Sequence, residues 1–157
     1  MFLFQIIDAF EKEELQYAII GGYAMALHGL VRATVDIDFV LNLNKNDFEK
    51  AEKILLTLGL QSRLPISAND VITMRKEYIE NRNLLAWSFV DHKNFTRQVD
   101  ILITHDLKKM DCVRISVGGR KISVASLPQL LKLKKISARP QDLIDIENIQ
   151  KKIDEKK

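Results

Sequence analysis

Two aspartates two residues apart are the most chemically suggestive feature of the sequence. Asp36 and Asp38 lie in the segment 34–41, whose alternating apolar residues predict a β-strand. Residues i and i+2 of a strand point to the same face, about 7 Å apart. Strands disfavour aspartate and neighbouring like charges repel, so this pair indicates a bound Mg²⁺ or Mn²⁺, cations that prefer oxygen ligands. The alternative is a purely structural pair.

A third aspartate, Asp100, stands among apolar residues in a strand predicted over 98–104. If this strand lies beside the segment 34–41, three carboxylates converge. Such a set can hold one or two metal ions that bridge a triphosphate, and it can include a base for an attacking hydroxyl. A salt bridge to a lysine or arginine is the alternative for Asp100.

Two glycines, Gly21 and Gly22, separate a short apolar strand at 17–20 from a short helix at 23–28. Glycine lets the backbone approach a phosphate closely, and a helix N-terminus favours negative charge. Turns use Gly-Gly often, so the pair alone is weak evidence. Its position one short helix before the paired aspartates favours a phosphate contact.

Lys134 interrupts the apolar side of a helix predicted over 127–137. A lysine that faces inward needs an anionic partner, and a nucleotide phosphate would serve. The alternative is a lysine at the helix edge whose ammonium group reaches solvent. On the next helix, Asp142 and Asp145 lie three residues apart and are interpreted as a solvated face or a pairing with the helix dipole.

The remaining elements follow from hydrophobic period and turn residues. Further helices are predicted at 3–14, from the cap residue Asn44 to about 58, with less support at 71–78, and from Pro140 to about 153, before a frayed tail at 151–157. Further strands are predicted at 84–90, 113–117 and 121–124. This order predicts an α+β (α/β) fold with a mixed β-sheet flanked by helices. We expect one domain, 1–157, with its sheet core at about 15–125 and C-terminal helices at about 126–155.

Composition narrows the class of protein. The chain has 157 residues, 46% of them hydrophobic, and a net charge of +3, which is too balanced to indicate a nucleic-acid or membrane protein by itself. The longest early stretch without charge, 17–31, is too short to cross a bilayer, and the N-terminus lacks the features of a signal peptide. The single cysteine excludes an intrachain disulfide and favours a reducing, cytoplasmic setting.

The chain resembles the polymerase-β-like nucleotidyltransferase superfamily. The resemblance is strongest in Gly-Gly-Tyr-Ala-Met-Ala-Leu-His-Gly at 21–29 and Arg-Ala-Thr-Val-Asp-Ile-Asp at 32–38. More narrowly, it resembles the small prokaryotic branch related to the AbiEii-type and minimal nucleotidyltransferases of toxin–antitoxin systems. The segments 130–134 and 139–143 also resemble that branch, and the likeness runs from about 17 to 149.

The resemblance implies roles for seven residues. Asp36, Asp38 and Asp100 would be the metal-binding, catalytic carboxylates, Gly21 and Gly22 would lie against the triphosphate, and Arg32 and Lys134 would be candidate phosphate or nucleotide contacts. A surface ion pair is the alternative for Arg32. The superfamily often has Gly-Ser where this chain has Gly22-Tyr23, so a serine contact to phosphate would be missing.

These residues favour an enzyme that transfers a nucleoside monophosphate from an NTP, ATP among the candidates, to a hydroxyl and releases pyrophosphate. The acceptor could be a protein side chain, a tRNA 3′ end or a small molecule. The short chain favours a macromolecule, in a system with a toxin or antitoxin partner. Two alternatives are a catalytically silent binding or antitoxin subunit and, with less support, a nucleic-acid-binding module that uses Lys132, Lys135 and Arg139.

Overall fold

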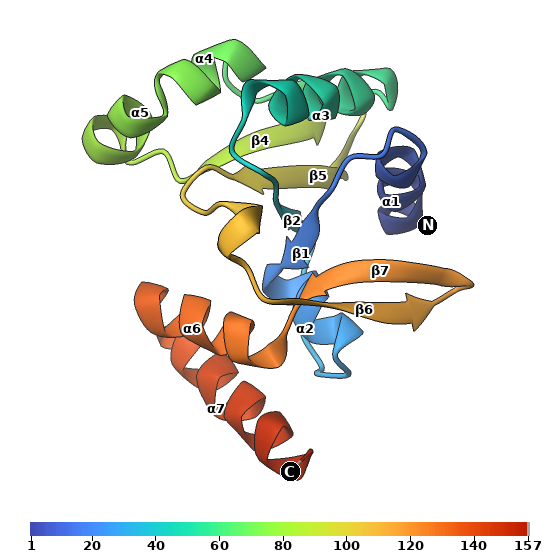
Figure 1. The fold of residues 1–157 in the computed structure, drawn as a ribbon, viewed down its shortest axis with the longest axis vertical. Helices are drawn as coiled ribbons and strands as arrows, with labels where there is room; N and C mark the ends of the chain where they lie inside the picture. The colour runs from blue at the N-terminus through green and yellow to red at the C-terminus, as the bar shows by residue number, and fades with distance from the viewer. Residues whose placement is uncertain (157) are drawn as a thin grey trace.

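The computed structural model describes residues 1–156, which form a seven-stranded sheet with helices around it (Figure 1). The helices are α1 (Phe2–Lys12), α2 (Gly21–Leu27), α3 (Lys45–Thr57), α4 (Ala68–Thr73), α5 (Arg75–Arg82), the 3₁₀-helix η1 (Leu107–Lys109), α6 (Leu127–Ser137) and α7 (Pro140–Glu155). The strands are β1 (Ala18–Ile20), β2 (Ile37–Val40), β3 (Gln61–Ser62), β4 (Ala86–Asp91), β5 (Asn94–Leu102), β6 (Cys112–Val117) and β7 (Arg120–Ala125). The predicted fold class is confirmed.

The sheet is mixed, and β2 lies at its centre. The strand order is β3-β4-β5-β2-β1-β7-β6. β2 pairs with β1 in antiparallel and with β5 in parallel orientation, while β4–β5 and β6–β7 are antiparallel hairpins. β5 pairs with β2 although the helices α3, α4 and α5 lie between them in the sequence, so strands far apart in the sequence become neighbours in the sheet.

The core lies on one face of β2 and β5. Ile37, Phe39, Val99 and Ile101 are fully buried there. Phe39 meets the ring of Phe10 from α1 at a centroid distance of 5.0 Å. Because side chains alternate along a strand, burying this set turns the intervening residues of both strands to the opposite face.

The C-terminal helices lie apart from the helices that cover this core. Figure 1 shows α6 and α7 at the lower left, whereas α3 and α4 lie at the top of the molecule. Ser126 caps α6 by accepting a hydrogen bond from the Gln129 amide, and Pro140 begins α7. The predicted bounds of α6 are confirmed.

Several predicted bounds are wrong. The strand predicted at 34–41 begins only at Ile37, so Asp36 lies in the bend before β2. The segment 60–83 contains β3, α4 and α5, where one uncertain helix was expected. α7 continues through the predicted tail to Glu155, and residue 157 lies outside the described residues.

Among residues 1–156, no helix is both long enough and apolar enough to cross a membrane.

Candidate active site

The pairing of β2 with β5 brings the three predicted carboxylates to one place. Asp38 and Asp100 are directly opposite each other in the parallel ladder, on the face turned away from the core. Asp36 precedes Asp38 by two residues and shares that side of the chain. The pKa values of Asp36 and Asp38 both respond to Asp100, by charge repulsion and by a hydrogen bond between carboxyl groups. The convergence expected from the sequence is therefore found.

The charge in this cluster is not neutralised. Burial first, and then repulsion from Asp100 and Asp36, raises the pKa of Asp38 to about 7. Burial and repulsion from Asp100 also raise the pKa of Asp36. Within residues 1–156, none of the three carboxylates forms a salt bridge. The site therefore favours an added cation or a proton.

The donor set suits a hard divalent cation, although the side chains do not form a preorganised cage. In the described part of the chain, no group of three or more His, Cys, Asp or Glu side chains is arranged to hold a metal ion. Mg²⁺ is usually held by only one or two carboxylates together with substrate phosphates and water. Asp38, with Asp36 or Asp100, supplies such a pair of oxygen ligands.

Of the two predicted phosphate-contacting glycines, Gly21 packs against this cluster and Gly22 packs against Thr34. Gly21 has φ +72°, and a Cβ atom added to it would collide with the Asp38 carboxylate. A Cβ on Gly22 would lie 2.6 Å from Cβ and 2.8 Å from Oγ1 of Thr34. The start of α2 therefore adjoins the carboxylates only because both residues lack side chains. Their contact with a triphosphate stays a prediction.

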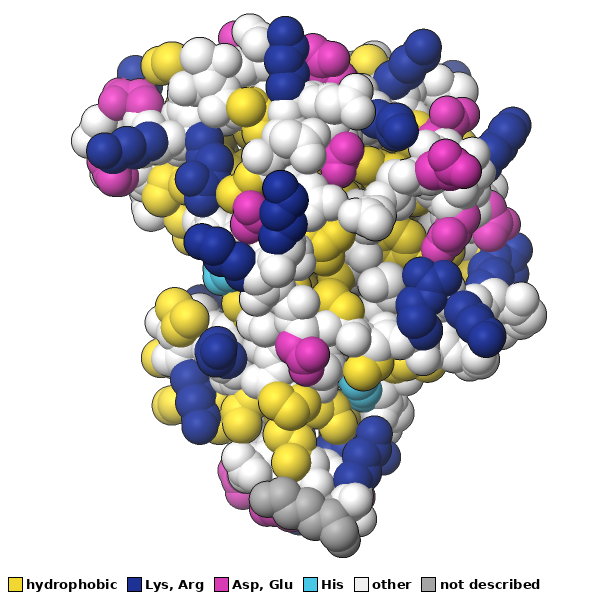
Figure 2. Space-filling view, viewed as in Figure 1, with side chains coloured by type: hydrophobic (Ala, Val, Ile, Leu, Met, Phe, Trp, Pro, Cys, Tyr) yellow, Lys and Arg dark blue, Asp and Glu magenta, His cyan; other side chains and the backbone are white. Residues whose placement is uncertain are grey.

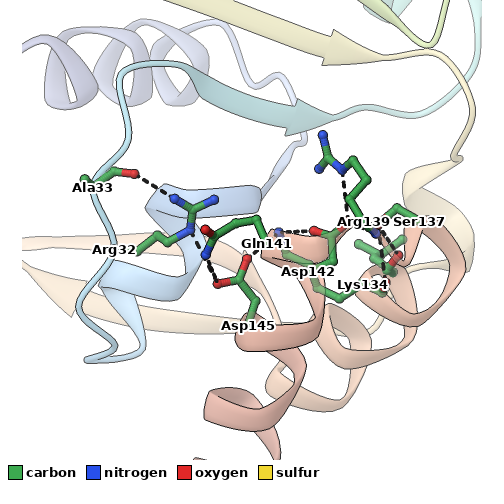
Figure 3. Close-up of polar contacts among 9 residues, drawn as sticks. Arg32, Ala33, Lys134, Ser137, Arg139, Gln141, Asp142 and Asp145 are labelled. Carbon is green, nitrogen blue, oxygen red and sulfur yellow. Dashed lines mark hydrogen bonds and ion pairs between the residues drawn. The ribbon is translucent and has the colours of Figure 1, made fainter.

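Lys134 has its anionic partners within the chain. Its Nζ lies 3.2 Å from Oδ1 of Asp142 and 3.1 Å from Oδ2 of Asp145 (Figure 3). Asp142 and Asp145 are 0% and 1% exposed, so their interpretation as a solvated face of α7 is wrong. Lys134 also lies near enough to Asp38 to lower the pKa of that carboxyl. It therefore lies between the buried carboxylates of α7 and the carboxylate cluster.

Arg32, the other candidate phosphate contact, reaches the same part of α7. Its Nε lies 3.5 Å from Oδ1 of Asp145 (Figure 3). Arg139 binds Asp142 instead, with Nε 3.0 Å from Oδ2. Although burial alone would raise the pKa of Asp142, hydrogen bonds from Arg139, Ser137 and Lys134 hold it well below its usual range. Asp142 is therefore an ionised, buried anchor between α6 and α7.

Sequence reasoning missed two residues beside the carboxylates. Gln98 donates from Nε2 to Oδ1 of Asp100 at 3.1 Å, and Arg63 donates from Nη2 to Oε1 of Gln98 at 2.9 Å. Gln98 precedes Asp100 by two residues in the same strand, a spacing that could have identified it. Arg63 comes from the segment whose structure the sequence did not reveal, and no local pattern indicates it.

Comparison with known proteins places this site within a known fold. No sequence family and no curated protein sequence matches the chain. Among solved structures, the lincosamide antibiotic adenylyltransferase LnuA, with lincomycin bound, is 16% identical over 95% of this chain and 94% of its own, with a TM-score of 0.65. The antibiotic-resistance factor ANT(2'')-Ia is 15% identical over 94% of this chain and 80% of its own, with a TM-score of 0.64. A nucleotidyltransferase-like protein from Paracoccidioides brasiliensis is 17% identical over 94% and 74%, with a TM-score of 0.57. The chain thus has a nucleotidyltransferase-like fold.

We predict that Asp38→Asn stabilises the metal-free protein at high pH. An acid whose pKa is raised on folding from 3.8 to about 7 destabilises the folded state once it ionises. The raised pKa corresponds to at most about 4 kcal/mol at pH 8, and because Asp38 is partly exposed to solvent we expect about half of this. The gain from Asp38→Asn should therefore be about 2 kcal/mol at pH 8, a Tm increase of roughly 4–8 °C, and should disappear towards pH 4. Thermal unfolding in EDTA at several pH values measures this. Asp154→Asn on the exposed side of α7 is the control, and an unchanged Tm for Asp38→Asn at pH 8 would contradict the prediction.

We predict that Gly21→Ala is more destabilising than Gly59→Ala. Both glycines have positive φ, +72° and +88°, so alanine strains the backbone at both, by about 1 kcal/mol. Only at Gly21 does a Cβ also meet the Asp38 carboxylate, whereas nothing lies within 4 Å at Gly59. Urea unfolding should show an additional loss of about 1–2 kcal/mol for Gly21→Ala. Equal losses at the two positions would refute the close packing of α2 on Asp38.

Proposed function

We propose that this protein is a metal-dependent nucleotidyltransferase that transfers a nucleoside monophosphate from an NTP to a hydroxyl and releases pyrophosphate. The observation that carries the proposal is the convergence of Asp36, Asp38 and Asp100, none of which forms a salt bridge within residues 1–156. A nucleotidyltransferase-like fold at low sequence identity supports it.

The carboxylates divide the chemistry between them. Asp38 with Asp36 or Asp100 would hold Mg²⁺ or Mn²⁺, which when bound neutralises the triphosphate and polarises it for attack. The acceptor oxygen forms a bond to the α-phosphorus, and the bond from this phosphorus to the bridging oxygen of the β-phosphate breaks. Pyrophosphate leaves with that oxygen. Asp100 would accept the proton of the hydroxyl, and the hydrogen bond from Gln98 would orient its carboxylate.

The nucleotide would lie between α2 and the C-terminal helices. The backbone at Gly21 borders the Asp38 carboxylate, and Gly22 follows it against Thr34, so phosphates held by the metal would lie close to this turn. Arg32 and Lys134, which both pair with Asp145, would be the cationic contacts of the triphosphate on this side of the site. ATP is one candidate, and no contact of the chain selects among the four bases.

The acceptor side favours an anionic macromolecule. Two adjoining hollows of about 370 and 420 Å³ share Arg75 and Thr104, which follows β5 beyond Asp100. Their other basic side chains are Lys76, Lys109 and Lys132, and their acidic side chains are Glu80 and Asp106, so cations are in excess. Within residues 1–156 none of the four cations forms a salt bridge. Figure 2 shows Lys and Arg side chains gathered around the indentation between α5 and α6.

In this proposal the acceptor approaches over these hollows, whose cations suit an acceptor that carries phosphates next to its hydroxyl, such as the 3′ end of a tRNA. An amine-rich antibiotic, such as the tobramycin of the ANT(2'')-Ia complex, would be repelled there. We therefore favour RNA over a protein side chain or a small molecule. We also propose that the protein acts together with a toxin or antitoxin partner, as in the AbiEii-type branch.

A catalytically silent subunit of such a pair is the second candidate. The observation that favours it is Tyr23, which is partly buried where the superfamily often has a serine. A silent subunit would keep the fold and its partner and would transfer no nucleotide.

We predict that incubation with each labelled NTP, Mg²⁺ and a cell extract gives a labelled product, and that Asp36→Asn and Asp100→Asn each lower its rate about 100-fold or more. EDTA should abolish labelling, and Asp154→Asn should leave it unchanged. Separation of the product into RNA, protein and small-molecule fractions identifies the acceptor.

Each part of the proposed function is contradicted by a different result of this experiment. No metal-dependent binding or transfer with any of the four NTPs would refute the enzyme, and a co-purified partner without turnover would favour the silent subunit. Label in a protein or small molecule would retain the enzyme and refute the RNA acceptor.

A further inference from the structure

One ion pair joins the connection before β2 to the C-terminal helices. Residues 28–36 link α2 to β2 and end with Asp36 in the bend. Arg32 in this connection lies 3.5 Å from Asp145 of α7, and its Nη1 donates to the neighbouring carbonyl of Ala33 at 3.0 Å. Figure 3 shows Arg32 extending from the connection towards Asp145 of α7, the residue that Lys134 of α6 also contacts.

The connection has little else to hold it. Val31 is fully exposed and Val35 is 54% exposed. The Thr34 hydroxyl donates to the carbonyl of Asp36, a bond within the connection itself. Among the described residues, the Arg32–Asp145 pair and the interaction of Asp36 with Asp100 are the polar side-chain contacts that tie residues 31–36 to other elements. Since Ile37 in β2 holds the end of the connection, the Arg32–Asp145 pair is the contact that holds its middle against α7.

The two buried carboxylates of α7 differ in how completely they are bonded. Asp142 accepts from Lys134, Ser137 and Arg139, so both of its oxygens are used. Asp145 is almost fully buried as well. Gln141 donates to its Oδ1 at 3.3 Å, and Lys134 Nζ lies 3.1 Å from its Oδ2. The Arg32–Asp145 contact, at 3.5 Å, is the longest ion pair of this cluster, and within residues 1–156 the buried Nε of Arg32 makes no hydrogen bond, which is costly for a buried guanidinium.

We propose that Asp145 is a positioning residue for the nucleotide site. Its carboxylate pairs with two cations from different elements, Arg32 from the connection and Lys134 from α6. Both cations are thereby held where the phosphates of the nucleotide would bind. Asp145 thereby fixes the connection that carries Asp36 against α7 before a nucleotide arrives. This inference rests on the proposed function, in which Arg32 and Lys134 contact the phosphates. Preorganisation of this kind reduces the ordering cost of binding.

The first test needs no activity. Asp145→Asn keeps the shape of the side chain and removes its charge, and Asp154→Asn on the same helix is the matched control. Without nucleotide, amide hydrogen exchange of residues 30–36 should become about tenfold faster in Asp145→Asn and stay unchanged in the control. Equal exchange in wild type and Asp145→Asn overturns the inference, whether or not the protein transfers nucleotides.

The second test separates positioning from a loss of folded protein. Because the bound nucleotide must order the freed connection, KM for the NTP should rise about tenfold in Asp145→Asn while kcat changes less than about threefold. A merely structural role would lower kcat through the fraction folded and leave KM unchanged. In the double variant Arg32→Gln/Asp145→Asn the increase in KM should be smaller than the product of the two single increases, since both changes break the Arg32–Asp145 pair and only the Lys134–Asp145 contact is lost in addition. Fully independent effects of the two changes on KM overturn the inference. If the wild-type protein transfers no nucleotide, the proposed function is refuted, and the hydrogen-exchange test still shows whether Asp145 holds the connection.

Discussion

Repulsion among three carboxylates on one face of the β2–β5 pair is the constraint on which the rest of the site depends. The fully buried apolar residues on the other face, Phe39 and Val99 among them, fix this orientation, because a register shift of one residue would bury the aspartates instead. Gly21 leaves room for the Asp38 carboxylate, which a side chain would occupy. Apolar packing therefore offsets the repulsion between like charges that are held together, as expected of a site that receives a cation and a polyphosphate.

Much of the local structure follows from the sequence. Strand alternation places Asp36 and Asp38 on one side, and this prediction holds even though Asp36 lies in the bend before β2. Asn44 caps α3 by accepting a hydrogen bond from the Asp47 amide, as its side chain predicts. The strands at 113–117 and 121–124, which become β6 and β7, and the bounds of α6 were also predicted, because strand patterns and caps act over only a few residues.

Contacts between residues far apart in the sequence could not be predicted in the same way. Whether Asp100 meets Asp38 depends on the pairing of β2 with β5, and strand pairing across such a distance leaves no local pattern. α5 has no fully buried residue, so its sequence lacks the apolar stripe that reveals an amphipathic helix. Lys134 did indicate a buried anion, but nothing in the sequence distinguished a phosphate from the carboxylates of Asp142 and Asp145, which also bind it.

The most direct test of this account is Mn²⁺ binding, followed by electron paramagnetic resonance in the presence of a non-hydrolysable NTP analogue. The account predicts binding that strengthens as the pH rises through about 7, where Asp38 loses its proton, and that is lost in Asp38→Asn. Mn²⁺ binding of equal strength in wild type and Asp38→Asn would show that the metal, if the protein uses one, is held elsewhere, and the proposed reaction centre would be wrong.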